Sequence, residues 1–113
     1  MWNKFGAKKT TVDGIRFDSQ KEAARYCELK RLESIGEIER LELQPKFKLL
    51  PPFVYNGEKI RGIVYRADFA YYRGGVKYIE DVKGFKTKEY QIKKKFLLYN
   101  MAESKEKTIF IET

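Results

Sequence analysis

Two aspartates in the middle of the chain are predicted to face each other across a β-hairpin. Asp68 lies in YRADFAYYR and Asp81 in VKYIEDVKG, and both segments are rich in the aromatic and β-branched residues that favour strands. Gly74-Gly75 is the only break between them, and glycines tolerate the positive φ of a tight turn. With these glycines as the central residues of the turn, Asp68 lies directly across from Asp81. Because side chains alternate along a strand, Lys83 shares their face.

Two facing carboxylates suggest a divalent cation. Like charges that face each other destabilise a sheet by about 0.2–1 kcal/mol unless a positive charge lies between them. Mg²⁺ binds carboxylate oxygens and keeps several waters that a phosphate can displace, and Lys83 would reach one of these waters. The sequence equally allows an exposed hairpin in which the aspartates and the lysine form surface pairs. A one-residue change of the turn would also remove the pairing of the two aspartates.

Two helices are expected around this hairpin. Residues 19–35 have helical periodicity, and Gly36 is expected to end this helix. Its apolar face comprises Tyr26, Leu29, Leu32 and Ile35. A second helix is expected over residues 88–104, with Thr87 as its cap. Its buried side is predicted to comprise Ile92, Phe96 and Tyr99.

Strands are expected over residues 39–52, 58–73, 76–84 and 107–112. The first ends at the breaker Pro51-Pro52, and the second and third are the arms of the hairpin. The resulting order is helix, three strands, helix, strand. This order predicts a mixed α/β fold in a single domain that spans residues 1–113, without repeats or linkers.

Glu22 allows two interpretations. Ser19 and Glu22 have the spacing of a capping box, in which the glutamate side chain accepts the backbone N–H of Ser19. Alternatively, the first turn of the helix lies over the open end of the hairpin, and Glu22 supplies a third carboxylate to the metal site. The local sequence favours the cap, and the fold decides between the two.

The composition excludes several classes of protein. The 113 residues include 24 Lys and Arg and 16 Asp and Glu, and a net charge of +8 favours a nucleic-acid partner. The absence of histidine excludes Ser-His and Cys-His nucleophile pairs and Cys2His2 zinc fingers. No apolar run approaches the roughly 18 residues of a membrane span, and there is no signal peptide, so we expect a cytoplasmic protein without a membrane partner. Cys27, the only cysteine, is expected in the core.

Positive charge concentrates after the second aspartate. Residues 83–95 hold six lysines and one acidic residue. Such a run can be a solvated helix face, but beside a candidate metal site we expect it to bind phosphates. The basic leader over residues 1–16 is either an arm that grips DNA or a solubilising tail. The predicted DNA-binding residues are Lys86, Lys88, Lys93 and Lys95 in the basic segment and Lys8 and Lys9 in the leader.

Asp68, twelve intervening residues and then Asp81-Val82-Lys83 resemble the D...(D/E)-x-K signature of the PD-(D/E)XK nuclease superfamily. Five segments within residues 17–96 together resemble a small phage and prophage family of this superfamily: FDSQKEAARYCEL, GEIERLELQPKFKL, YRADFAYY, EDVKG and YQIKKKF. The resemblance implies a restriction-endonuclease-like domain, in which helices flank a central mixed sheet.

The same resemblance implies roles for individual residues. The matches to the superfamily's metal ligands are Asp68, Asp81, the Val82 carbonyl and the helix residue Glu22, with Mg²⁺ as the metal and Mn²⁺ as a substitute. Lys83 would position the attacking water. The implied function is endonucleolytic cleavage of DNA by a homodimer in the bacterial host cytoplasm, on branched, Holliday junction-like substrates in phage recombination or replication. The alternatives are a general nicking endonuclease and a DNA-binding module that kept the nuclease fold.

Overall fold

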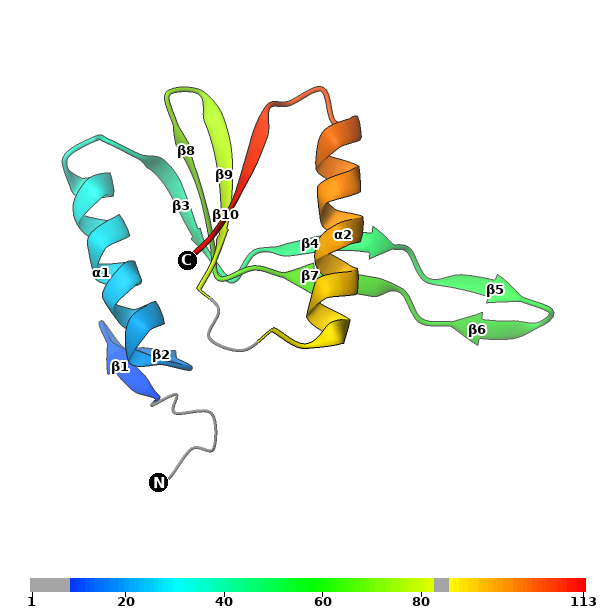
Figure 1. Ribbon diagram of the computed structural model, residues 1–113. Coiled ribbons are helices and arrows are strands. Elements are labelled where there is room, and N and C mark those ends of the chain that lie inside the picture. The colour runs from blue at the N-terminus through cyan, green and yellow to red at the C-terminus, as the bar shows by residue number, and fades with distance from the viewer. Residues whose placement is uncertain (1–8, 83–85) are drawn as a thin grey trace.

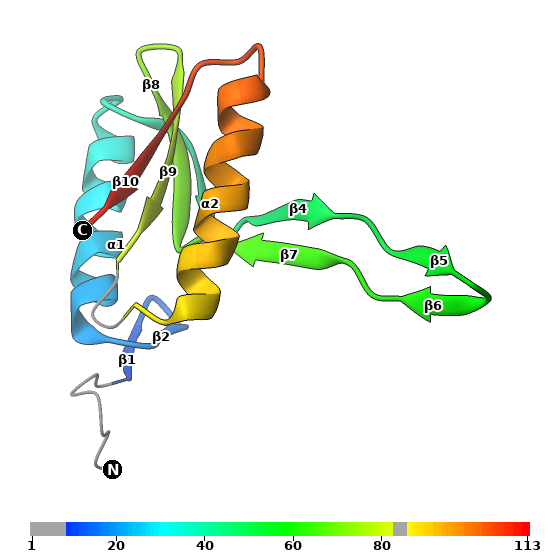
Figure 2. The same cartoon turned by 45° about the vertical axis from the view of Figure 1, so that its right-hand side comes forward.

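A four-stranded mixed sheet lies between two helices (Figure 1). The computed structural model describes residues 9–82 and 86–113. Helix α1 (Gln20–Ser34) covers one face of the sheet, and helix α2 (Lys88–Glu103) covers the other (Figure 2). The expected mixed α/β class is therefore confirmed. The strands are β1 (Thr10–Val12), β2 (Ile15–Phe17), β3 (Glu39–Leu43), β4 (Lys46–Leu50), β5 (Phe53–Tyr55), β6 (Glu58–Ile60), β7 (Ile63–Arg66), β8 (Phe69–Arg73), β9 (Val76–Asp81) and β10 (Thr108–Glu112).

The main sheet has the strand order β10-β9-β8-β3. Strand β9 runs antiparallel to β8 and parallel to β10, and α2 provides the crossover connection that a parallel pair requires. Arg73 pairs with Val76, so Gly74 and Gly75 are the central residues of the β8–β9 turn, with φ of +58° and +78°. The predicted turn and register of this hairpin are confirmed.

Helix α1 begins and ends where the sequence indicates. The Ser19 side chain accepts a hydrogen bond from the Glu22 N–H at 3.1 Å, and Gly36 follows the last turn with a φ of +81°. The buried residues on its inner face include Ala23, Tyr26 and Leu29. Ile35, which was predicted on this face, is 65% exposed because the helix ends at Ser34. Cys27 is also exposed rather than in the core, because the inner face of the helix passes through its neighbour Tyr26.

Helix α2 begins after Thr87, whose side-chain oxygen accepts the N–H of Tyr90 at 3.0 Å. The predicted buried side of this helix is wrong. Ile92, Phe96 and Tyr99 are 58%, 54% and 64% exposed. Leu97 is buried instead, with Tyr90 and Met101 packed around the same core. Since α2 carries apolar residues on two faces, periodicity alone cannot identify the face that packs on the sheet.

Two of the predicted strands are interrupted, which the sequence pattern did not indicate. Residues 39–52 form β3 in the main sheet and β4 outside it, with a break at Gln44, whose φ is +52°, and at Pro45. Residues 58–73 form three strands, with breaks at Arg61-Gly62 and Ala67-Asp68. Strand β4 pairs with β7, and β5 pairs with β6. We call these paired strands, residues 46–66, the ribbon; it projects away from the main sheet (Figures 1 and 2).

The second half of the basic leader is folded. Strands β1 and β2 form an antiparallel hairpin, whose Val12 and Ile15 pack against the core beneath α1. Residues 10–16 of the predicted arm are therefore part of the folded domain, and residues 1–8 lie outside the described part of the chain. Neither of the described helices is long and apolar enough to cross a membrane.

Candidate metal-binding and catalytic site

The two predicted aspartates meet at the point where β8 begins and β9 ends. Asp68 immediately precedes β8, and Asp81 is the last residue of β9. Asp81 Oδ1 accepts the backbone N–H of Asp68 at 2.9 Å, and Asp68 Oδ2 accepts the backbone N–H of Val82 at 2.7 Å. Each carboxylate is therefore anchored to the strand of the other aspartate, and the two side chains are held at one end of the hairpin.

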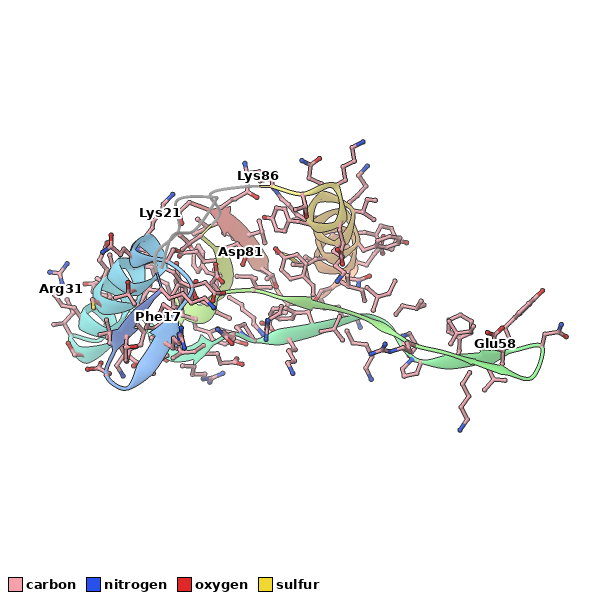
Figure 3. The ribbon with its side chains drawn as sticks, turned by 90° about the horizontal axis from the view of Figure 1, so that it is seen from below. Phe17, Lys21, Arg31, Glu58, Asp81 and Lys86 are labelled. Carbon is pink, nitrogen blue, oxygen red and sulfur yellow. The ribbon has the colours of Figure 1, made fainter. Side chains whose placement is uncertain are left out.

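Tyr65 of β7 holds the second oxygen of Asp81. Its hydroxyl donates a hydrogen bond to Asp81 Oδ2, and both residues are buried. Burial, followed by this hydrogen bond to Asp81, raises the pKa of Tyr65, so its hydroxyl keeps the proton that it donates. Figure 3 shows Asp81 between the two helices, near the root of the ribbon that carries Tyr65. The ribbon and the main sheet therefore share this site.

The neighbouring acid, Glu80, points to the opposite face of β9 and is also fully buried. Arg25 of α1 donates to Glu80 Oε2 through Nε at 2.6 Å and to Oε1 through Nη2 at 3.0 Å, and the Tyr71 hydroxyl donates to Oε1 at 2.8 Å. The hydrogen bond to Glu80 raises the pKa of Arg25. Burial, followed by the hydrogen bond to Glu80, raises the pKa of Tyr71 to about 12. This network fastens α1 to the sheet.

The remaining predicted ligands and Lys83 occupy different positions. Glu22 lies in the first turn of α1 and is 5% exposed. Its N–H donates to the Ser19 side chain, which is one of the two hydrogen bonds of a capping box. Val82 follows β9, and its side chain packs against the core on the α1 side. Lys83 lies outside the described residues. The structure thus brings Asp68 and Asp81 together and leaves the predicted catalytic lysine undescribed.

The donor set fits a hard cation such as Mg²⁺. Mg²⁺ in proteins is usually bound through one or two carboxylates and retains several waters, and Asp68 and Asp81 offer two carboxylates from adjacent strands. Within residues 9–82 and 86–113, no group of three or more His, Cys, Asp or Glu side chains is placed to hold a metal. Glu22 is therefore not grouped with the two aspartates in the described structure.

Several of the predicted DNA-binding lysines form ion pairs with acids of the same chain. Lys86 pairs with Glu112 at 2.8 Å, and Lys93 pairs with Glu89 at 3.1 Å. Lys86, then Tyr90 and Lys94, hold the pKa of Glu112 at about 2, so this carboxylate is ionised at neutral pH. Three further predicted residues, Lys9, Lys88 and Lys95, are exposed and have no ion pair among the described residues, whereas Lys8 lies outside them.

A model of the family described as "Protein of unknown function (DUF1064)" matches residues 2–111. The chain belongs to this family. No curated protein matches it. The DUF1064 match covers both aspartates, both helices and the ribbon, whereas Glu112 lies just beyond it.

Three residues of this DUF1064 site were not predicted from the sequence. Tyr65 lies three residues before Asp68, in a run of apolar residues where a hydroxyl is not distinctive. Arg25 and Tyr71 bind Glu80, and here the sequence does carry a signal. Alternation along β9 places Glu80 on the same face as Tyr78 and Val82, and a carboxylate on an apolar face requires a cationic partner.

We expect Glu80→Gln to destabilise the fold by up to about 3–5 kcal/mol, because it removes the buried partner of the ion pair and leaves Arg25 with only the exposed Glu28 as a counter-charge. Glu28→Gln is the matched control, since Glu28 is the exposed second partner of Arg25 at 3.3 Å and an exposed pair contributes at most about 1 kcal/mol. Urea unfolding measures the change in the free energy of unfolding for both variants, provided that the slope m stays unchanged. Equal costs for the two variants would contradict the anchoring role of Glu80.

Proposed function

We propose that this chain is a metal-dependent DNA endonuclease of the PD-(D/E)XK superfamily. The observation that carries the proposal is the pair of aspartates at adjacent strand ends, held by Val82 N–H, Asp68 N–H and the Tyr65 hydroxyl. A net charge of +8 supports a polyanionic substrate. The resemblance of the Asp68, Asp81 and Lys83 pattern to the superfamily signature supplies the reaction class.

The arrangement of the main sheet supports a restriction-endonuclease-like domain. The helices and the strands of this sheet follow in the order α1, β3, β8, β9, α2, β10, which parallels helix, three strands, helix, strand. The β1–β2 hairpin and the ribbon are additions to that order. Asp68 immediately precedes β8 and Asp81 ends β9, the second and third of these strands, where the signature residues are expected.

Asp68 and Asp81 would hold Mg²⁺ or Mn²⁺, with the Val82 carbonyl as a further oxygen donor. Glu22 is not grouped with the two aspartates in the described structure and is kept as a proposed ligand from the resemblance alone. A bound divalent ion polarises phosphoryl oxygens and lowers the pKa of water. Asp81 is fixed before substrate arrives, because Asp68 N–H and Tyr65 hold both of its oxygens. Lys83 is proposed to orient the attacking water.

The proposed substrate is branched, Holliday junction-like DNA, cleaved by a homodimer in the cytoplasm of a bacterial host during phage recombination or replication. This choice is supported by the family resemblance and by the placement of the positive charge. The described Lys and Arg side chains can neutralise phosphates, and contacts to phosphates position a duplex without reading its bases. Selectivity is therefore expected to follow the shape of the DNA.

We expect Asp81→Asn to reduce Mg²⁺-dependent cleavage by more than about 100-fold. Replacing a residue that only contacts a metal ligand already lowers metal affinity or activity by about 10–100-fold. Affinity for DNA without metal should stay the same or rise, since one anion facing the phosphate is removed. Linear duplex, single-stranded, flap and four-way-junction DNA are incubated with Mg²⁺ and, in parallel, with EDTA. Asp18→Asn, at an exposed aspartate before α1, is the control that should retain activity. Parallel loss of binding and cleavage in Asp81→Asn would instead assign this residue a structural role.

Glu22→Gln separates the two interpretations of Glu22 in the same assay. Glutamine keeps a capping side chain but loses the charge, so a cap tolerates the change in both activity and melting temperature. We expect most cleavage to be lost and the melting temperature to be nearly unchanged, as for a residue that acts on the metal. Wild-type turnover in this variant would exclude Glu22 from the metal site.

A further inference from the structure

Apart from Tyr65 at its root, the ribbon is not used by the proposed chemistry. It leaves the main sheet beside Asp68 and projects away from the body in both ribbon views (Figures 1 and 2). The molecule measures 50 × 41 × 23 Å along its principal axes. Ten residues of β structure span about 33 Å, close to the roughly 34 Å of one turn of B-DNA. The ribbon therefore has the length of one helical turn of a duplex.

One face of the ribbon next to its root is basic. Lys46 is paired directly with Arg66, and Lys48 with Val64, so the side chains of all four lie on one face. Phe47 and Tyr65, on the opposite face, pack into the core that α2 covers. Like charges directly opposite each other destabilise an antiparallel pair. A Lys–Arg cross-strand pair is therefore unfavourable unless an anion binds to it.

The described acidic side chains do not neutralise these charges. Among the described residues, no ion pair joins Lys46, Lys48 or Arg66 to an acidic side chain. In contrast, Lys86 and Lys94 on the other side of the site both pair with Glu112. The root of the ribbon therefore carries positive charge that no described acidic side chain neutralises.

The basic character continues towards the tip. Residues 46–66 contain five basic residues and one acidic residue, a net charge of +4. Lys59 and Arg61 are exposed on β6 and just after it, and Glu58 is the single acid. Two aromatic side chains near the tip, Phe53 and Tyr55, are also exposed. Lysine and arginine with exposed aromatic residues are the side chains expected on a nucleic-acid-binding surface.

The ribbon is continuous with the candidate site. Arg66 is two residues from Asp68, and Tyr65 donates its hydroxyl hydrogen bond to Asp81. A cavity of about 490 Å³ at the root of the ribbon is lined in part by Lys46, Arg66 and Lys93. Tyr65 also lines this cavity, so the cavity adjoins the residue that holds Asp81, and Lys46 and Arg66 place basic side chains at its edge.

We infer that the ribbon binds double-stranded DNA on one side of the cleaved phosphate, over about one helical turn. A two-stranded β-ribbon fits the major groove of B-DNA, which is about 12 Å wide, and the basic residues neutralise phosphates beside the groove. This inference deepens the proposed function and rests on it, because the duplex bound by the ribbon is the arm of the substrate that enters the site.

The test uses two exposed lysines of the ribbon, away from the aspartates. The variant Lys48→Gln/Lys59→Gln is compared with Lys30→Gln/Arg31→Gln, which removes the same charge from exposed positions on α1. Figure 3 shows Arg31 and the ribbon residue Glu58 at opposite ends of the molecule. Affinity for a 30-base-pair duplex is titrated against salt in EDTA, so that cleavage does not interfere.

We expect the slope of log K against log salt to decrease in magnitude by about 2 in the ribbon variant, since each lost phosphate contact is worth about 0.9. The α1 control should keep the wild-type slope. An unchanged slope in the ribbon variant overturns the inference. If the ribbon variant keeps the wild-type slope but sediments with a different oligomeric state, the inference is also overturned, because a second copy of the chain would then occupy the ribbon.

Cleavage with Mg²⁺, measured separately, distinguishes this inference from the proposed function. If the wild-type protein cleaves DNA but the ribbon variant keeps the wild-type salt slope, the nuclease proposal stands and the ribbon is not a duplex-binding surface. If the wild-type protein cleaves no DNA but the ribbon variant has a smaller salt slope, the ribbon is a DNA-binding surface and the proposed catalysis is wrong. A wild-type protein that does not bind duplex DNA overturns both.

Discussion

The proposed site depends on one reciprocal interaction, in which Asp68 and Asp81 each accept a backbone N–H from the strand of the other. The interaction requires the register set by the Gly74-Gly75 turn, because a one-residue slip would move one aspartate to the opposite face of the sheet. It also fixes two carboxylates side by side before any ligand binds. A cation between them would relieve their repulsion, and the proposed metal-dependent chemistry rests on this geometry.

Strand β9 carries two consecutive buried acids with different roles. Glu80 faces α1 and is matched by the guanidinium of Arg25 and the Tyr71 hydroxyl, so its charge stabilises the position of the helix. Asp81 faces the other side, where β7 supplies Tyr65. The interruption between β7 and β8 at Ala67-Asp68 connects the site to the ribbon, since the same bend that precedes β8 turns β7 away from the sheet. The site and the ribbon therefore share this interruption of one predicted strand, and the ribbon also requires the break at Gln44-Pro45 in the other.

Local chemistry in the sequence predicted much of this arrangement. The glycine pair defined the hairpin register, and Ser19, Thr87 and Gly36 marked the helix ends, because turns and caps depend on a few neighbouring residues. Long-range packing was not predictable in the same way. The buried face of α2 depends on which of its two apolar faces meets the ribbon and sheet, and the ribbon depends on positive φ at Gln44, which is not a glycine. The pairing of Glu80 with Arg25 joins residues 55 positions apart.

The most direct test of the central claim is a crystal structure of the protein grown with Mn²⁺, with anomalous scattering used to locate the metal. The account predicts an anomalous peak between Asp68 and Asp81, with carboxylate oxygens from both residues at about 2 Å, the distance for a divalent ion of this size. A protein saturated with Mn²⁺ that shows no peak between these two carboxylates, or whose only peaks lie away from them, would contradict the account.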